Sequence, residues 1–158
     1  MYIANYGSPF GNIVLSADEK GLTELSFKEK IPPEETSENE IITQTKKWLD
    51  IYFGGNAPDF TPPLNLKATD FRRRVWKILL EIPYGKTMTY GEIADKLAAE
   101  SERGRMSAQA VGGAVGNNPA AIIIPCHRVI GSDGSLTGYR WGISRKKALL
   151  DLERGSFY

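Results

Sequence analysis

The sequence predicts a mixed α/β (α+β) fold of 158 residues, in which an antiparallel sheet with one helix precedes a mostly helical part. Residues 1–27 contain three strand-like runs separated by turns. In the second half, apolar residues recur mostly at the spacing of a helix. A stretch with three prolines, residues 56–67, separates the two patterns and reads as a linker. We therefore expect an N-terminal α/β domain over residues 1–66 and a C-terminal domain over residues 67–158.

The first part combines short strands with one helix. Segments 1–6, 11–17 and 21–27 are apolar or alternating, and Gly, Pro and Asp punctuate them, so they predict antiparallel strands. Residues 28–39, rich in Glu, Pro and Ser, predict an exposed loop. Residues 40–53 place apolar side chains at helical spacing and end at a glycine pair, which predicts a helix.

The second part carries helix-start signals. Thr69 or Asp70 can cap a helix that runs through Glu81. Thr89 and Glu92 have the spacing of a capping box, which predicts that a second helix starts between them.

A third helix is predicted from its cap and its composition. Ser107 can cap residues 108–115, which are nearly all small and include Ala110 and Gly113. Such a surface lets another molecule approach the backbone closely. This helix and the one before it, joined by a short polar connection, resemble a helix-turn-helix.

The last elements follow this helix. The β-branched run at residues 122–124 predicts a buried strand, and residues 129–130 are also strand-like. A final helix is expected to be capped by Ser144 and to run to Glu153.

Charge is divided unevenly along the chain. Residues 1–66 hold five basic and ten acidic residues, a net charge of −5, whereas residues 67–158 hold fifteen and nine, a net charge of +6. A basic half indicates a polyanionic partner, with phosphates as the obvious target.

One cysteine and one histidine limit the possible chemistry. They exclude an internal disulfide and a zinc site built only from Cys and His, and we expect no metal and no cofactor. A free thiol favours a reducing compartment, so we expect a cytoplasmic location. We also expect the protein to be a monomer. No apolar run approaches the length of a membrane span, and we expect no membrane partner.

The single cysteine, Cys126, is next to the single histidine, His127. By residue type alone, a lone cysteine is more often a small buried hydrophobic residue than a nucleophile. A reactive thiolate needs a base, and an orienting carboxylate would fix the tautomer of that base. Asp133, Asp151 and Glu153 are the nearest acidic residues in sequence, and spacing does not choose among them.

Several short motifs occur in this chain and can be considered together. The first is Pro-Cys-His-Arg-Val at residues 125–129. The others are the Tyr-Gly-Ser-Pro-Phe-Gly turn at 6–11, the helix ending in Pro-Tyr-Gly at 71–85, Ala-Val-Gly-Gly-Ala at 110–114 with Asn-Pro at 118–119, Leu-Thr-Gly-Tyr at 136–139, and Leu-Leu-Asp-Leu-Glu at 149–153. Together these motifs resemble the O6-alkylguanine-DNA alkyltransferases, the methylated-DNA–protein-cysteine methyltransferases, and the match covers nearly the whole chain in order.

The resemblance implies a fold and a reaction. The N-terminal sheet would be ribonuclease-H-like and the C-terminal domain winged-helix-like, with a helix-turn-helix that enters the minor groove of double-stranded DNA. Cys126 would accept the alkyl group from O6-methylguanine in a single-turnover repair reaction, with O4-methylthymine as a second candidate substrate. His127 would take the thiol proton through a water, and Glu153 would orient His127. Tyr90 would help to rotate the 3′ phosphate and could donate a proton to the departing guanine.

The resemblance also implies DNA- and substrate-binding residues. Asn118 would brace the turn between the small-residue helix and the cysteine, and Tyr139 would line the pocket. The remaining predicted DNA- or substrate-binding residues are Gln109, Ala110, Gly113, Arg128 and Trp141.

Two positions depart from the family pattern. Gln109 stands where the family commonly has an arginine that fills the gap left by the flipped base, so weaker DNA binding is expected. Arg140 and Trp141 stand where many members have small residues. Trp141 would narrow the pocket, or alternatively pack at its edge, since tryptophan is usually well buried.

Three other functions are compatible with parts of the pattern. A non-catalytic lesion-binding relative would lack the acceptor cysteine, and a plain helix-turn-helix regulator would read sequence without forming a covalent product. A cysteine hydrolase would more often have its histidine far from the cysteine in sequence.

Overall fold

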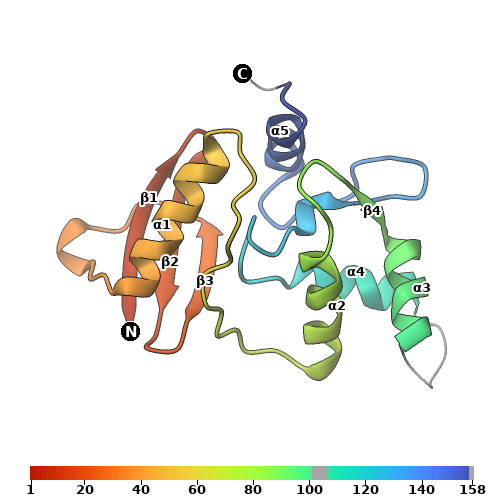
Figure 1. The fold of residues 1–158 in the computed structure, drawn as a ribbon, viewed down its shortest axis with the longest axis horizontal. Coiled ribbons are helices and arrows are strands. Elements are labelled where there is room, and N and C mark those ends of the chain that lie inside the picture. Colours follow the sequence, from red (N-terminus) through yellow and green to blue (C-terminus); the bar gives the residue numbers. More distant parts are fainter. Residues whose placement is uncertain (101–106, 157–158) are drawn as a thin grey trace. The chain divides into compact units, whose positions relative to one another are not determined.

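The computed structural model describes residues 1–100 and 107–156, and it confirms the mixed α/β fold class (Figure 1). The chain divides into two compact units, each with its own internal contacts. Of the described residues, the first unit holds 1–67 and 119–121, and the second holds 68–100, 107–118 and 122–156.

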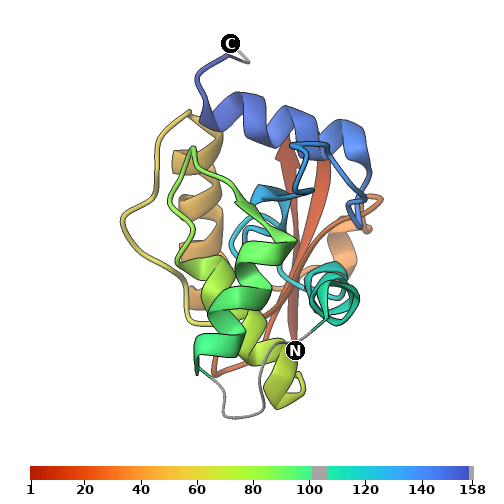
Figure 2. The same ribbon diagram turned by 90° about the vertical axis from the view of Figure 1, so that its right-hand side faces the viewer.

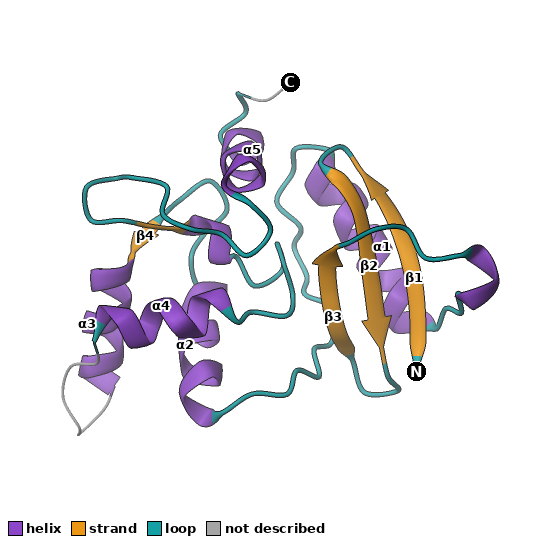
Figure 3. Cartoon of the chain, turned by 180° about the vertical axis from the view of Figure 1, so that it is seen from behind, coloured by secondary structure: helices purple, strands orange, loops and turns teal. Residues whose placement is uncertain are grey.

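The first unit contains an antiparallel sheet whose strands follow one another in sequence order. The strands are β1 (Tyr2–Ser8), β2 (Gly11–Ala17) and β3 (Leu22–Phe27), and Figure 3 shows them side by side. Gly11, directly opposite Ser8, has a φ of 125°, a conformation that favours glycine, and it allows the tight reversal between β1 and β2.

Helix α1 (Glu40–Phe53) covers one face of this sheet (Figure 1). The side chain of Asn39 accepts a hydrogen bond from the backbone N–H of Ile42 and caps the helix start. The buried face has the predicted helical spacing and consists of Ile42, Thr45, Trp48, Leu49, Tyr52 and Phe53.

Three helices of the second unit pack on one another, as Figure 2 shows. They are α2 (Asp70–Leu80), α3 (Tyr90–Glu100) and α4 (Ala108–Gly116). The indole N–H of Trp76 donates to the carbonyl of Ala114 at 2.9 Å and fastens α2 to α4. Residues 101–106, which form most of the predicted connection of the helix-turn-helix, lie outside the described residues.

Three of the predicted helix starts in the second unit, at Thr69, Thr89 and Ser107, are confirmed. The hydroxyl of Thr69 accepts from the N–H of Arg72, and the hydroxyl of Ser107 accepts from the N–H of Ala110. The capping box at Thr89 forms in both directions, since the N–H of Glu92 donates to the Thr89 hydroxyl and the Glu92 carboxylate accepts from the N–H of Thr89.

Two short strands and a final helix complete this unit. β4 (Met88–Thr89) and β5 (Val129–Ile130) pair in parallel, with Met88 opposite Val129. Helix α5 (Ile143–Glu153) follows a long loop.

The Ile run does not form the predicted strand. Residues 122–124 are buried, but they lie in turns, and Ile122 has a φ of 70°. This left-handed conformation is costly for a β-branched residue, about 1–3 kcal/mol, and it is incompatible with an extended strand.

Two further details differ from the sequence-based expectations. Gly142, with a φ of 101°, occupies the N-cap position of α5, and Ser144 lies inside its first turn. Residues 119–121, expected in the C-terminal domain, pair with β3 through hydrogen bonds to both backbone groups of Leu25.

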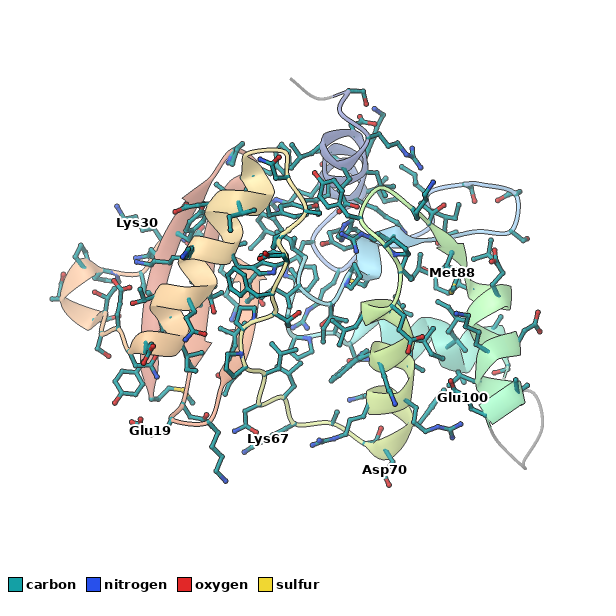
Figure 4. All side chains as sticks on the ribbon, viewed as in Figure 1. Glu19, Lys30, Lys67, Asp70, Met88 and Glu100 are labelled. Atoms are coloured by element: carbon teal, nitrogen blue, oxygen red, sulfur yellow. The ribbon has the colours of Figure 1, made fainter. Side chains whose placement is uncertain are left out.

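Several of the charged side chains that Figure 4 labels lie at turns or at helix ends. Glu19 lies in the turn after β2, and Lys67 on the segment that precedes α2. Asp70 and Glu100 begin α2 and end α3, and all four side chains are exposed.

Candidate active site

Cys126 and His127 lie on a single 3₁₀ turn, Cys126–Arg128, which follows Pro125. The N–H of Cys126 donates to the carbonyl of Ile124 at 2.8 Å, and the N–H of Arg128 donates to that of Pro125 at 2.9 Å. The chain then continues as β5, which pairs with β4. Tyr90, the first residue of α3, directly follows β4, and it lines the same cavity as Cys126.

The thiol of Cys126 is buried, with 3% of the residue exposed. Burial raises the pKa of Cys126 to about 11, against the opposing effects of an Asn118 hydrogen bond and the positive charges of Lys146 and Arg140. The thiol is therefore protonated near neutral pH, and it needs a base before it can act as a nucleophile.

Asn118 connects the end of α4 to the cysteine. Its side-chain N–H₂ donates to the carbonyl of Ile124 at 2.8 Å and to Sγ of Cys126 at 3.3 Å. The residue is completely buried. An amide that donates to sulfur stabilises the thiolate, so this contact favours ionisation as well as holding the turn.

His127 is completely buried and faces Glu153, with 2.5 Å between Nε2 and Oε2. Burial lowers the pKa of His127 below its ordinary value, although Glu153 acts in the opposite direction. A neutral imidazole beside a carboxylate carries its proton on the facing nitrogen, Nε2. The lone pair then lies on Nδ1, which is buried without a hydrogen-bond partner among the described residues, so Nδ1 is the atom able to accept a proton.

Glu153 receives hydrogen bonds on both carboxylate oxygens. Oε1 accepts from the N–H of Gly85 at 3.0 Å and from Nε of Arg128 at 2.8 Å, while Oε2 accepts from Nη2 of Arg128 at 3.2 Å and faces His127. Burial alone would raise the pKa of the Glu153 carboxyl, but the hydrogen bonds and charges of His127 and Arg128 outweigh it and lower the pKa. The carboxylate stays ionised and fixes the tautomer of His127.

The other two candidate carboxylates lie elsewhere. Asp133 accepts from the N–H of Ser135 at 3.0 Å in an exposed turn. Asp151 pairs with Lys147 at 2.7 Å on the surface of α5. Of the three acidic residues that the sequence left open, the structure brings only Glu153 to His127.

Arg128, which was predicted to bind DNA, belongs to this buried network. Besides pairing with Glu153, it donates from Nη1 to the carbonyl of Ile82 at 2.8 Å and lies over the ring of Tyr84. Only 8% of Arg128 is exposed. A guanidinium occupied in this way neutralises a buried carboxylate and is not presented to a phosphate.

The network should make the protein sensitive to acid. Because the pKa of Glu153 lies below its ordinary value of 4.5, its contribution to stability is complete above that pH and is lost as the pH falls below it toward the folded-state pKa. The lowered pKa of His127 acts in the same direction, since stability declines as the pH falls below 6.5. We expect the difference in melting temperature between the wild type and Glu153→Gln to shrink as the pH is lowered below about 4.5, toward the folded-state pKa of Glu153. Differential scanning calorimetry at several pH values would measure this, and a difference that grew in acid would contradict it.

A cavity of about 250 Å³ opens onto Cys126. Tyr139 forms part of its wall, and the buried Tyr139 hydroxyl has no hydrogen-bond partner among the described residues. Burial, and then the proximity of Cys126, raise the pKa of Tyr139 well above its ordinary value. The remaining lining residues are Tyr90, Gly112, Val115, Gly116, Gly138 and Arg140.

Trp141 is not part of this lining, and the packing alternative describes its position better. Its ring packs edge-on against Tyr139 at 5.3 Å between centroids, and the guanidinium of Arg140 lies over it at 5.2 Å. Trp141 therefore fixes its two neighbours, which do line the cavity.

A wider groove of about 600 Å³ adjoins the cavity, and the two share Tyr90 and Gly112. Gln109 lies in this groove, whereas Ala110 and Gly113 are exposed on α4 outside its lining. The other lining residues of the groove are Gly91, Ala108, Ser132 and Thr137.

Lys146 was missed by the sequence analysis. Its side chain is completely buried, and Nζ donates to the carbonyls of Thr137 at 3.1 Å and Gly138 at 3.4 Å. It thereby holds the loop that forms one wall of the cavity. Its burial could have been predicted from the sequence, because Lys146 lies three and four residues before Leu149 and Leu150 and therefore on the same, apolar face of the helix.

Within residues 1–100 and 107–156, no group of three or more His, Cys, Asp or Glu side chains is placed to hold a metal ion. In the same residues, no helix has both the length and the apolar character needed to cross a membrane.

Two family models match this chain and together span most of its length. The ribonuclease-like domain of 6-O-methylguanine DNA methyltransferase matches residues 1–66, and the DNA-binding domain of the same protein matches residues 70–155. The chain belongs to the 6-O-methylguanine DNA methyltransferase family. It is a DNA repair protein that transfers an alkyl group to a cysteine, as the names of its relatives also indicate.

The similarity to individual members of the methyltransferase family extends over nearly the full chain. The methylated-DNA–protein-cysteine methyltransferase of Mycobacterium tuberculosis is 46% identical over 151 residues, which is 93% of this chain and 88% of the relative. The protein of the same name from Methanosarcina acetivorans is 42% identical over 158 residues, with 97% and 98% covered. The crystal structure of Mycobacterium tuberculosis OGT in complex with DNA has a TM-score of 0.85 at 44% identity, covering 99% of this chain and 94% of that one.

Proposed function

We propose that this methyltransferase repairs double-stranded DNA by moving the methyl group from O6 of methylguanine to Sγ of its own Cys126, once per molecule. The observation that carries the proposal is the cavity that ends at the buried thiol and shares Tyr90 and Gly112 with the groove beside α4. Guanine O6 lies inside the duplex stack, so the damaged nucleotide must leave the stack and enter such a cavity, at a cost of a few kcal/mol.

The reaction begins with loss of the thiol proton. The proton passes from Cys126 through a water to Nδ1 of His127, and the resulting imidazolium is stabilised by ionised Glu153. The thiolate then attacks the methyl carbon, a carbon–sulfur bond forms, and the carbon–O6 bond breaks with its electron pair left on guanine. The thioether product has no free thiol, so the protein reacts once.

Tyr90 is placed to receive the departing guanine. It lines both the groove and the cavity, and its oxygen accepts a hydrogen bond from the hydroxyl of Thr137 at 3.1 Å. Its own hydroxyl proton is then directed away from Thr137 and can be donated to the guanine anion. Tyr139, on the cavity wall, would support the flipped base.

The exposed side of α4 suits close approach to DNA in the minor groove. A Cβ added at Gly113 would meet no atom within 4 Å, so the surface there is open, and Ala110 beside it is small. Phosphate contacts from the basic second half would supply affinity independent of sequence. Because the DNA contacts and the acceptor thiol both belong to the second half, we propose a DNA-binding and acceptor domain over residues 67–158 and a separate N-terminal domain over residues 1–66. We also propose a cytoplasmic location, where a free thiol persists.

Gln109→Arg should tighten binding to duplex DNA. Gln109 lies in the groove beside α4, and an arginine there adds a positive charge that can reach the orphaned cytosine or a phosphate. We expect an increase in affinity of about threefold to tenfold for undamaged duplex at low salt, measured by fluorescence anisotropy. Gln44→Arg on α1 adds the same charge to the first unit and serves as the control. Equal tightening by both variants would show an effect of net charge alone.

The cavity should discriminate strongly by adduct size. Arg140 and Tyr139 line it, and Trp141 packs against both, so the wall cannot retreat easily. We expect methyl adducts to react well and free O6-benzylguanine to inactivate the protein at least about tenfold more slowly than it inactivates the Trp141→Gly variant. Residual activity after incubation with the benzylated base measures this. Fast inactivation of the wild type would contradict it.

The proposed substrate can be tested directly on DNA. Duplexes that carry one O6-methylguanine or one O4-methylthymine are incubated with excess protein and digested, and their nucleosides are quantified. We expect O6-methylguanine to be converted to guanine, and the second duplex shows whether O4-methylthymine is also repaired. Persistence of O6-methylguanine with folded protein would overturn the proposal.

A further inference from the structure

The cavity at Cys126 has a positive charge on its wall for which a transferred methyl group offers no partner. The side chain of Arg140 lines the cavity, and two contacts hold its guanidinium in place. Nη1 donates to the backbone carbonyl of Asn118 at 2.9 Å, and the guanidinium lies over the ring of Trp141. An arginine retained by a hydrogen bond and a ring contact is a fixed charge with further N–H donors available.

The other charges near the cavity do not cancel it. The remaining lining residues are neutral, and the buried carboxylate of Glu153 is paired with Arg128 and faces His127. Lys146 adds a second positive charge behind the loop of Thr137 and Gly138. The electrostatic environment of the alkyl group is therefore positive.

We propose that Arg140 is a specificity-determining residue of this cavity, whose guanidinium favours transfer of alkyl groups that end in a carboxylate, such as carboxymethyl, over neutral groups of the same size. The inference rests on the proposed function and assigns to one residue of the same site a role in choosing among adducts. A methyl group gains nothing from a guanidinium, whereas a carboxylate on the transferred carbon can receive a hydrogen bond from it.

The chemistry of such an adduct explains why the charge matters. The thiolate of Cys126 attacks the CH₂ carbon, a carbon–sulfur bond forms, and the carbon–O6 bond breaks with its electron pair left on guanine. The product is S-carboxymethylcysteine, and the carboxylate keeps its charge throughout. Two anions approach each other in this step, and the guanidinium of Arg140 lowers that repulsion.

The test compares two adducts of almost equal size in the same duplex, O6-carboxymethylguanine and its neutral amide, O6-carbamoylmethylguanine. Single-turnover rates are measured for the wild type, for Arg140→Gln, and for Arg154→Gln, which removes an exposed charge after α5. We expect the carboxymethyl-to-carbamoylmethyl rate ratio to fall about threefold to fivefold in Arg140→Gln and to stay unchanged in Arg154→Gln. The wild-type ratio should also fall as salt is raised, which tests the inference without any substitution.

The rate of methyl transfer from O6-methylguanine distinguishes a failure of the role of Arg140 from a failure of the proposed function. If methyl transfer proceeds but the ratio is the same in wild type and Arg140→Gln, the role of Arg140 is overturned and the proposed function remains. If Arg140→Gln slows all three adducts equally, Arg140 acts on the thiolate or on the DNA backbone and not on the adduct, and the inference is again overturned. If the wild type transfers no methyl group, the proposed function itself fails.

Discussion

Cys126→Ser should lose methyl acceptance by at least about a thousandfold while keeping its fold and its DNA binding. The serine hydroxyl is close in size and can still accept the hydrogen bond from Asn118 that the sulfur accepts now. It is a far weaker acid than a thiol, so His127 cannot convert it into the nucleophile. Transfer of labelled methyl from duplex DNA to protein measures the loss.

Melting temperature and anisotropy on undamaged duplex provide the controls for Cys126→Ser. Both should stay close to the wild-type values, because the substitution keeps the volume and the hydrogen bond. Methyl transfer to any other residue of this variant at a rate near that of the wild type would contradict the assignment of Cys126.

Glu153→Gln should lower both stability and reaction rate. The amide removes the negative charge that pairs with Arg128 and leaves a buried guanidinium uncompensated, at a cost of about 3–5 kcal/mol. The N–H₂ group of the glutamine also cannot accept a hydrogen bond from the donors that face the Glu153 carboxylate. The tautomer of His127 is then no longer fixed, and we expect methyl transfer to slow by about a hundredfold to ten-thousandfold.

Asp151→Asn is the matched control for that substitution. It makes the same chemical change on the same helix, but Asp151 pairs with Lys147 at the surface, where such a pair contributes about 0.3–0.5 kcal/mol. Urea denaturation and single-turnover rates of the two variants can be compared directly. If Glu153→Gln lost no more stability than Asp151→Asn, the buried network would not have the role that its geometry indicates.

Features that depend on a few neighbouring residues were predictable from the sequence. Thr69, Thr89 and Ser107 cap helices as expected, because a cap bonds to an N–H group within three residues of itself. The apolar face of α1 follows from its 3.6-residue period.

Features that depend on distant parts of the chain were not predictable in the same way. The run at residues 122–124 has the composition of a strand, but the backbone turns at Ile122 and no local signal marks that turn. Arg128 resembles a surface charge until its partners are known, and Ile82 and Glu153 lie 46 and 25 residues away.

The side chains of the loop before α5 could not be placed from the sequence either. It lacks a regular period, so the sequence could not decide whether Arg140 or Trp141 faces the cavity. The structure assigns the lining to Arg140 and the supporting ring to Trp141. The choice of Glu153 over Asp133 and Asp151 came from family resemblance, since spacing left it open, and the network around His127 supplies its physical reason.

The most direct test of the reaction is a titration of the wild-type protein with increasing equivalents of duplex DNA that carries O6-methylguanine, followed by peptide mass spectrometry. We expect methylation to saturate at one group per chain, at one equivalent of lesion, and to lie on the peptide that contains Cys126. Methyl groups on another residue, or repair that continues past one equivalent while Cys126 stays unmodified, would contradict a single-use acceptor at this thiol.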